Sequence, residues 1–437
     1  MRIAVKFSYK TLQDLRDDAK ALQLTLPIQE DTAPLAAPLT VNRGRVENRL
    51  GIHPMEGCDG ESDGSPGPLT HRRYQRFAAG GAGLLWFEAV AVHPRGMSNK
   101  RQLRITPENV DAFKVLVEAM HDTARQAWGG QPYNVFQLTH SGRYGLQRNI
   151  AVHIPELDAK VGLEPDYPVI SDDELAALVD HYVQAAMLAK AAGFDAVDIK
   201  GCHRYLLSEL LGAHTRPGRY GGSYENRTRM FREIAEAITA AVDVDLAIRF
   251  NSYDALPLPY GWGCDEHGEA DLSEPKRFVH DMEQLGVGLF NVSASSPYTA
   301  PHISRPYDQP GRFGYPPPEP QLKGVDRLLN LGRELKQELP NSVVMGTGYS
   351  WLRHMAGEVA AATVAQGWID IVGFGRGAFA YPDFANDILR GPGMQRSKAC
   401  ITCTKCAELK ASKALSGCVV RDSEVYLEPY RQLDQKA

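Results

Sequence analysis

Eight short apolar runs recur along the chain, and each is followed by a longer segment with helical spacing. Strands that are apolar almost throughout indicate a parallel sheet covered by helices on both faces. Eight such units predict an α/β fold, a (β/α)8 TIM barrel, whose active site lies at the carboxyl ends of the strands. An open, doubly wound sheet is the alternative, but no GxGxxG turn follows a strand to favour it. The predicted strands span residues 48–54, 84–92, 134–140, 195–201, 244–250, 289–295, 343–348 and 370–377.

The segments between these strands have the features of amphipathic helices. Over residues 172–194, apolar side chains recur on one helical face, and Ser171 stands where an N-cap is expected. Four of the predicted helices end in glycine shortly before the next strand, as in "LAKAAGFDAV". Glycine at this position is typical of helix ends, so it supports the alternation of helices and strands.

The predicted barrel domain, residues 48–391, is flanked by two extensions. An N-terminal extension covers residues 1–47, and a cysteine-rich C-terminal extension with a tail covers residues 392–437. Residues 296–320 are rich in proline and aromatic side chains and predict an ordered loop over the strand ends. Together with residues 57–70, this loop is a candidate lid that sets the shape of the pocket.

The composition is that of an ordinary soluble protein, with 43% hydrophobic and 23% charged residues. A net charge of −5 provides no basic field for nucleic acid. No apolar run approaches the roughly eighteen residues that cross a bilayer. The first residues turn charged before a signal peptide could form. We therefore expect a cytoplasmic protein that binds neither nucleic acid nor membrane.

Polar side chains and glycines follow the predicted strands, where a barrel places its chemistry. The last two strands end in the turns "GTGY" and "GFGRG", and loops at this position often bind phosphate in barrels. Tight turns with a surface arginine are the plain alternative. The candidate residues at the strand ends are Met55, Glu56, Ala89, Gln137, Lys200, His203, Tyr205, Arg249, Gly348, Tyr349, Gly375 and Arg376.

The stretch "FDAVDIKGCHRYLLSELL", followed by "GRYGGSYENRTR", resembles the Old Yellow Enzyme family of NAD(P)H:flavin oxidoreductases. Further matching segments follow in the same order: "HPM", "GGAGLLWFEA", "QLTHSGR" and "GFGRGAFAYPDF". The resemblance covers roughly residues 40–420 and implies a barrel that holds FMN non-covalently, with NAD(P)H as a possible electron donor.

The resemblance also implies roles for individual residues. The backbone near Met55 and Ala89 would contact the isoalloxazine ring, with Glu56 beside it. Gln137 would bind the pyrimidine edge, and Arg249 would place positive charge near N1. The phosphate would lie against Gly348, Tyr349, Gly375 and Arg376.

The fourth strand carries the predicted catalytic residues Lys200, His203 and Tyr205. In the family, a His-x-x-His or His-x-x-Asn pair binds the substrate's carbonyl oxygen, and a tyrosine donates a proton. Here Lys200 replaces the first histidine. A lysine ammonium carries a compact positive charge, so it favours a substrate with an anionic group. The alternative is a purely structural salt bridge from Lys200 to Glu56 or Glu88. Glu56 itself stands where the family often has Cys or Thr.

Four of the seven cysteines, Cys400, Cys403, Cys406 and Cys418, form the pattern C-x2-C-x2-C-x11-C. In a reducing compartment such a cluster indicates metal ligands rather than disulfides. The pattern resembles the cluster loop of the 2,4-dienoyl-CoA reductase and trimethylamine dehydrogenase types, which implies a [4Fe–4S] cluster. A structural zinc site and free thiols are the alternatives.

The leading hypothesis is an FMN and iron–sulfur oxidoreductase that passes hydride to an activated C=C bond of a small molecule. An oxidative alternative is a dehydrogenase or demethylase acting on a C–N or C–H bond. A remote alternative is a Schiff-base lyase that uses Lys200 as its nucleophile. Because the chain lacks the further nucleotide-binding domains of the resembling types, NAD(P)H or a separate electron-donor protein would supply the electrons. We also expect a homo-oligomer.

Overall fold

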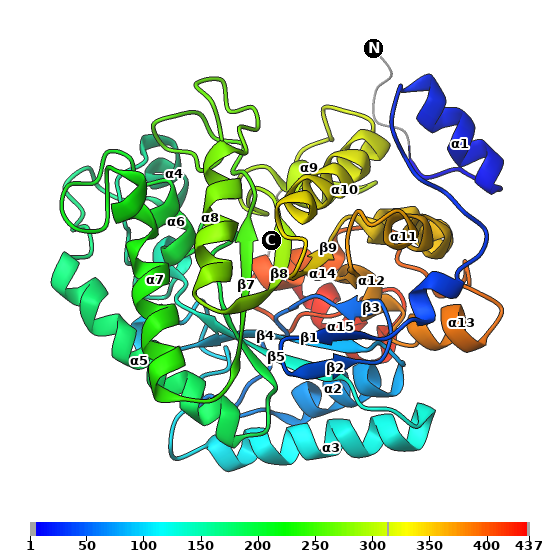
Figure 1. Cartoon of the computed structure of the whole chain (residues 1–437), viewed down its shortest axis with the longest axis horizontal. Helices are drawn as coiled ribbons and strands as arrows, with labels where there is room; N and C mark the ends of the chain where they lie inside the picture. Colours follow the sequence, from blue (N-terminus) through cyan, green and yellow to red (C-terminus); the bar gives the residue numbers. More distant parts are fainter. Residues whose placement is uncertain (1–5, 313, 435–437) are drawn as a thin grey trace.

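Eight parallel strands close into a barrel in the computed structural model, which describes residues 6–312 and 314–434 (Figure 1). The strand order around the barrel is β10-β3-β4-β5-β6-β7-β8-β9, so each strand pairs with its neighbours in the sequence. This confirms the predicted (β/α)8 fold. The strands are β3 (Leu50–Ile52), β4 (Leu84–Ala91), β5 (Tyr133–Thr139), β6 (Ala196–Ile199), β7 (Asp245–Asn251), β8 (Val287–Ser293), β9 (Val343–Gly346) and β10 (Ile371–Phe374).

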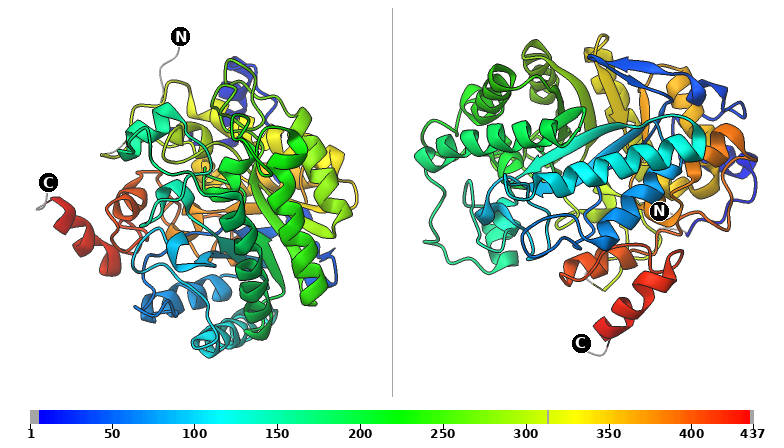
Figure 2. Two further views of the ribbon diagram at one scale, coloured as in Figure 1. Left: turned by 90° about the vertical axis from the view of Figure 1, so that its left-hand side faces the viewer. Right: turned by 90° about the horizontal axis from the view of Figure 1, so that it is seen from below.

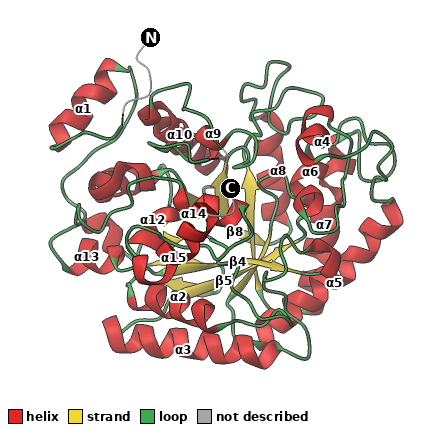
Figure 3. Ribbon diagram, turned by 180° about the vertical axis from the view of Figure 1, so that it is seen from behind, coloured by secondary structure: helices red, strands yellow, loops and turns green. Residues whose placement is uncertain are grey.

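Helices cover the outside of the barrel and alternate with the strands (Figure 3). The helix expected over 172–194 is α5, which begins with a capping box between Ser171 and Glu174. The long helices are α2 (Pro68–Ala79), α3 (Val110–Trp128), α5 (Asp172–Ala191), α7 (Tyr224–Ala241), α8 (Ser273–Gln284), α10 (Gln321–Glu338) and α11 (Ala356–Ala365). The short ones are α4 (Pro155–Val161), α6 (Leu206–Leu211), α9 (Pro301–Ser304), α12 (Arg376–Ala380) and α13 (Phe384–Arg390).

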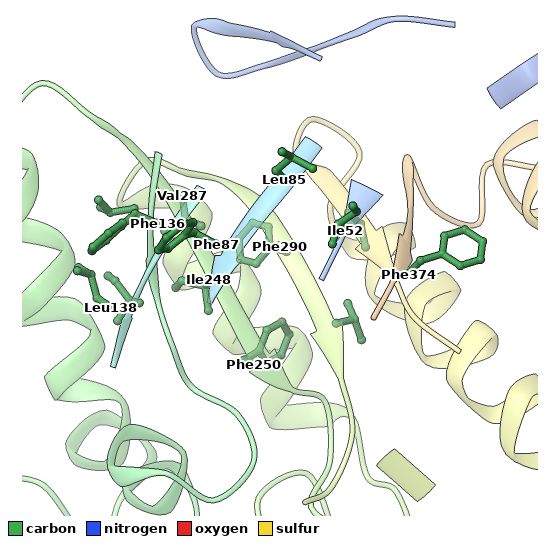
Figure 4. Packing of buried hydrophobic residues seen from close by; sticks show 14 of the residues in the cluster. Ile52, Leu85, Phe87, Phe136, Leu138, Ile248, Phe250, Val287, Phe290 and Phe374 are labelled. Atoms are coloured by element: carbon green, nitrogen blue, oxygen red, sulfur yellow. The ribbon is translucent and has the colours of Figure 1, made fainter. Parts of the chain in front are cut away.

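The main apolar core lies between the strands and the helices around them. Figure 4 shows aromatic and aliphatic side chains of adjacent strands packed together, including Phe87 and Phe136. These two rings stack with their centroids 5.8 Å apart. Successive side chains of a strand face opposite sides, so each strand sends every second residue into the barrel interior. That alternation decides which side chains reach the site.

The N-terminal extension closes one end of the barrel. It contains α1 (Leu12–Ala21) and a hairpin of β1 (Leu39–Val41) and β2 (Gly44–Val46). Val41 and Val46 of this hairpin belong to the apolar cluster that fills the barrel interior. Of the predicted extension 1–47, residues 1–5 lie outside the described residues.

The C-terminal extension packs against the barrel near α2 and ends in α14 (Lys405–Ala411) and α15 (Ser423–Asp434) (Figure 2). Two contacts fasten it. Asp422 accepts hydrogen bonds from Arg72 at 2.8 Å and Arg76 at 2.6 Å, and the Ser416 amide donates to the Gly57 carbonyl at 2.7 Å. Residues 435–437 of the predicted extension lie outside the described residues. None of the described helices combines the length and apolar character needed to cross a bilayer.

Candidate active site

A cavity of about 420 Å³ opens at the carboxyl ends of the strands, within the size range of cofactor and substrate sites. Two of the predicted residues lie behind its lining. The Ala89 carbonyl accepts a hydrogen bond from Gln102, and the Tyr349 hydroxyl lies 2.9 Å from that of Thr363. All other predicted flavin and catalytic residues line the cavity: Met55, Glu56, Gln137, Lys200, His203, Tyr205, Arg249, Gly348, Gly375 and Arg376.

Gln137 is held at the inner end of the cavity by Asp198 of β6. Its amide nitrogen donates to Asp198 Oδ2 at 2.7 Å, and Trp86 Nε1 donates to the same oxygen. The Arg249 backbone amide donates to Asp198 Oδ1. Because a carboxylate accepts hydrogen bonds, this contact fixes the Gln137 amide and leaves its carbonyl oxygen as an acceptor. Burial raises the pKa of Asp198 to about 6, although these donors oppose the shift.

Arg249 brings a positive charge to the cavity, and its guanidinium forms no ion pair with a described residue, although the Asp198 carboxylate lies close enough to interact with it. Its Nε is buried and has no hydrogen-bond partner, and the same holds for His53 Nε2 nearby. Burial, followed by the charge of Arg249, lowers the pKa of His53 well below its usual value. A buried donor without a partner is costly, so an acceptor of negative charge fits beside Arg249.

A pair of guanidinium groups, those of Arg305 and Arg376, lies near the turns that follow β9 and β10. Arg376 donates one hydrogen bond to the Pro306 carbonyl at 2.7 Å, while Nη1 of Arg305 and Nη1 of Arg376 are buried without partners. Burial, then the repulsion from Arg376, lowers the pKa of Arg305 to about 10. Beside them Gly348 has φ 111°, where a side chain would be strained and would press on Leu328. This corner fits a phosphate dianion.

Glu56 lies at the centre of a buried cluster of charges. Its Oε1 is 3.1 Å from Lys410 Nζ and 3.9 Å from Lys200 Nζ, and it accepts a hydrogen bond from Tyr205 at 3.4 Å. Burial raises the pKa of Glu56, but Lys410 and then Lys200 outweigh burial and lower it overall. Glu56 is therefore ionised, and the contact between Lys200 and Glu56 that we named as the alternative is present as a distant ion pair at 3.9 Å.

The three predicted catalytic side chains differ in charge. Burial lowers the pKa of Lys200 and raises that of Tyr205 well above its usual value. Burial, then the positive charge of Arg249, lowers the pKa of His203 well below its usual value. His203 is thus neutral, with Nε2 at 3.1 Å from Ser293 Oγ. Tyr205 holds its proton at neutral pH, which suits a proton donor.

Two further tyrosines form a wall of the cavity. The rings of Tyr144 and Tyr298 stack with centroids 4.2 Å apart, and the Tyr298 hydroxyl lies 3.3 Å from that of Tyr205. Tyr298 belongs to the loop expected over 296–320, which covers the strand ends and contains α9. Residue 313 of this loop lies outside the described residues.

All four clustered cysteines, Cys400, Cys403, Cys406 and Cys418, line a second and smaller cavity. Cys406 and Arg376 line both cavities, so the two sites adjoin. Burial raises the pKa of Cys406 to about 12 and that of Cys418 to about 11. Among the described residues, no three His, Cys, Asp or Glu side chains are arranged to hold a metal ion.

The sequence pattern of the NADH:flavin oxidoreductase / NADH oxidase family matches residues 34–260, more than half of the chain. The chain belongs to this family. The match covers β3 to β7, and with them Gln137, Lys200, His203 and Tyr205. The C-terminal extension lies outside it.

Among curated family members, NADH oxidase of Thermoanaerobacter brockii is 29% identical over 373 residues, which cover 82% of this chain and 51% of the relative. The 12-oxophytodienoate reductase 7 of Oryza sativa subsp. japonica is 28% identical, over 84% of this chain and 91% of the relative. A structure of 2-naphthoyl-CoA reductase with 2-naphthoyl-CoA shares the fold at 20% identity, with a TM-score of 0.70 over 89% of this chain and 57% of that one. The chain thus spans about half the length of the first and last of these proteins.

Sequence reasoning missed five residues of the cavity lining and one residue behind it: His53, Tyr144, Tyr298, Arg305, Lys410 and, behind Gln137, Asp198. Asp198 had a signal, because a carboxylate inside the apolar run "DAVDIKG" must find buried partners. Arg305 had a weaker one, as a basic residue in the proline-rich loop over the strand ends. Lys410 had none, because nothing in the pattern of the extension indicates that α14 reaches Glu56.

Proposed function

We propose that this family member binds FMN non-covalently at the barrel mouth and transfers hydride from the reduced flavin to an activated C=C bond. The observation that carries the proposal is a set of polar groups lining one cavity: the Gln137 amide, and the guanidinium groups of Arg249, Arg305 and Arg376, each with a buried nitrogen that lacks a hydrogen-bond partner. An amide acceptor, a lone cation and a guanidinium pair match, in this order, the pyrimidine edge, the N1 region and the phosphate of FMN.

FMN would supply the hydride chemistry, and NAD(P)H is the expected source of its electrons. Gln137, oriented by Asp198, would accept a hydrogen bond from the pyrimidine ring. Arg249 would stabilise negative charge near N1. Arg305 and Arg376 would hold the phosphate, and the bare backbone at Gly348 leaves room for it.

The substrate would lie against Lys200, His203 and Tyr205. Neutral His203 and the Lys200 ammonium would donate hydrogen bonds to the carbonyl oxygen that activates the C=C bond, drawing electron density from the β-carbon. Tyr205 would donate its proton to the α-carbon. The wall of Tyr144 and Tyr298 would limit the access of water to this proton transfer.

The charges favour reduction of an alkene over oxidation of an amine. The Lys200 ammonium lies over the face of the Tyr205 ring, 4.0 Å from its centroid. It therefore occupies the aromatic surface that could otherwise bind a cationic amine substrate. Lys410 and Arg249 add further positive charge. A Schiff-base lyase would use Lys200 but leaves the unpaired arginines without a purpose.

The cysteine cavity supports a [4Fe–4S] cluster as an electron relay. Its four thiols are the donor set of such a cluster, and Cys406 also lines the flavin cavity. A structural zinc ion is the alternative, because four thiolates also form a tetrahedral zinc site. A separate electron-donor protein is the alternative to NAD(P)H, and these four cysteines would hold the cluster that connects it to the flavin.

Anaerobic photoreduction of the purified holoprotein tests the proposal. We expect a neutral unsaturated ketone, such as cyclohexenone, to reoxidise the flavin with formation of the saturated ketone. If no electron-poor alkene reoxidises the flavin while an amine or alcohol reduces it, the oxidative alternative replaces this one.

A further inference from the structure

Two lysine ammonium groups face a single carboxylate at the barrel mouth, and this excess of charge indicates a ligand. We propose that the substrate carries an anionic group, most simply a carboxylate, which Lys200 binds with an N–H group other than the one it offers to the carbonyl oxygen, and that Lys410 frees Lys200 for this role by neutralising Glu56. This inference rests on the proposed flavin function and names the substrate class of that site.

The distances show which lysine neutralises Glu56. Lys410 Nζ is 3.1 Å from Glu56 Oε1, within hydrogen-bond distance, whereas Lys200 Nζ is 3.9 Å from the same oxygen. The Lys200 and Glu56 side chains are 4% and 5% exposed, so water compensates neither charge well. Glu56 thus has its partner in Lys410, and Lys200 is the surplus cation.

Lys200 lacks a hydrogen-bond acceptor among the described residues. Its contacts are the face of the Tyr205 ring at 4.0 Å and the more distant Glu56. Neither contact is a hydrogen bond to the three N–H groups of the ammonium. A buried ammonium that lines a cavity with its donors unused is a site for an oxyanion.

The remaining charges at the cavity do not remove this surplus. Glu408 is the other carboxylate in the lining, and it already contacts Arg312 at 3.4 Å. His203 is neutral, and Tyr205 keeps its proton. The three arginines are committed to the flavin in the proposed function. With FMN bound, the two positive charges of Lys200 and Lys410 exceed the single negative charge of Glu56 by one. This remaining positive charge is available to the substrate.

The anion site depends on the cysteine-rich extension. Lys410 lies one helical turn after Cys406 on α14, and the Ser416 amide fastens this segment to the Gly57 carbonyl beside Glu56. The extension therefore supplies a specificity-determining residue to the barrel, in addition to any role in electron transfer.

Equilibrium binding of two matched probes to the oxidised holoprotein tests the inference. The change in the flavin absorbance spectrum reports how much of each probe is bound. The probes are acetylacrylate, an unsaturated ketone with a carboxylate, and its neutral amide, acetylacrylamide. In the wild type we expect the acid to bind at least about tenfold more tightly than the amide, as one nearly unscreened charge contact provides.

The variants separate the roles of the two lysines. In Lys410→Met, Glu56 has only Lys200 left, so we expect the preference for the acid to fall about tenfold or more. Lys410→Arg should restore it, which excludes misfolding of α14 as the cause. Glu56→Gln should retain or increase it, because both cations then lack a partner. Lys276→Met, which removes a lysine paired with Glu334 on the barrel surface, should change nothing.

Two other results would count against the inference in different ways. Equal binding of acid and amide, with neutral enones still reoxidising the photoreduced flavin, would overturn the anion site and leave the proposed function intact. Failure of every enone, neutral or anionic, to reoxidise the flavin would overturn the proposed function and this inference with it.

Discussion

Tyr205 shows how one buried side chain is prepared for its role. Its hydroxyl group donates to Glu56 and neighbours Tyr298, and burial together with the Glu56 charge raises its pKa well above the usual value. A phenol in this environment keeps its proton until a stronger base forms next to it. The α-carbon of a substrate that has accepted hydride at its β-carbon is such a base.

Replacing Tyr205 with Phe tests this role. The variant should accept electrons from NAD(P)H at the wild-type rate, because the hydroxyl takes no part in that half-reaction. Reoxidation by an enone should slow by about 10²-fold, the contribution of a lost general acid. Stopped-flow absorbance measures both half-reactions. Unchanged reoxidation would remove Tyr205 from the mechanism.

The ion pair between Glu56 and Lys410 predicts a pH dependence of stability. The folded protein lowers the pKa of Glu56 below 4.5, so the pair stabilises the fold fully above pH 4.5 and this contribution disappears as the pH falls through the lower, folded value. Lys410 is 32% exposed but Glu56 only 5%, so Lys410→Met leaves a buried carboxylate with Lys200 alone and should cost about 2 kcal/mol at pH 7 and progressively less in acid.

Urea unfolding of both proteins at pH 7 and at the lowest pH at which both stay folded measures this difference. Lys276→Met, at a surface pair, serves as the control and should cost about 1 kcal/mol or less at both pH values. A cost for Lys410→Met that is the same at both pH values would show that Lys410 acts by packing rather than by charge.

At the level of elements, α2 is joined to the barrel by a buried ion cluster. Arg73 of α2 donates to Asp59 and to Glu88, and all three side chains are at most 4% exposed. Burial, offset in part by Arg73, raises the pKa of Glu88 to about 7. The alternative salt bridge from Lys200 to Glu88 is therefore wrong, because Glu88 pairs with Arg73.

Arg73→Met should destabilise the protein by about 3–5 kcal/mol, because two buried carboxylates lose their partner. Arg76→Met is the matched control, since Arg76 is 36% exposed and shares Asp422 with Arg72. It should cost about 1 kcal/mol or less. Equal unfolding midpoints for the two variants in urea would contradict the structural role of the cluster.

The cysteine extension yields a separate prediction. Cys403→Ala should abolish broad absorbance near 400 nm from a cluster and reduce the bound iron and acid-labile sulfide, because three ligands hold a cluster poorly. Elemental analysis of anaerobically purified protein provides the measurement. Iron at the wild-type stoichiometry in Cys403→Ala would contradict this ligand assignment.

The alternation of elements was predictable, and the docking of the extension was not. All eight strands lie within the predicted apolar runs or within two residues of them, because burial on both faces leaves a strong local pattern. The contact between Lys200 and Glu56 also followed from the order of the strand ends. Lys410 meets Glu56 through packing between segments more than three hundred residues apart, and no local pattern encodes such a contact.

At the scale of the whole molecule, the barrel mouth gathers one amide and three arginines with unsatisfied nitrogens in a single cavity, and the account depends on FMN binding there. Gln137, Arg249, Arg305 and Arg376 come from β5, β7, the loop after β8 and the turn after β10. The closed strand order brings these four positions to one face. The same face receives the cysteine extension, so flavin, substrate and cluster would adjoin there.

The most direct test of this claim is the equilibrium binding of FMN to the flavin-depleted protein, measured by the quenching of flavin fluorescence. We predict one FMN per chain, with at least tenfold weaker binding in both Arg305→Met and Arg376→Met because each loses a charged contact to the phosphate. Arg390→Met, an exposed arginine of α13, should bind as the wild type does. A protein that takes up no FMN, or binds it equally well in all three variants, would contradict the account.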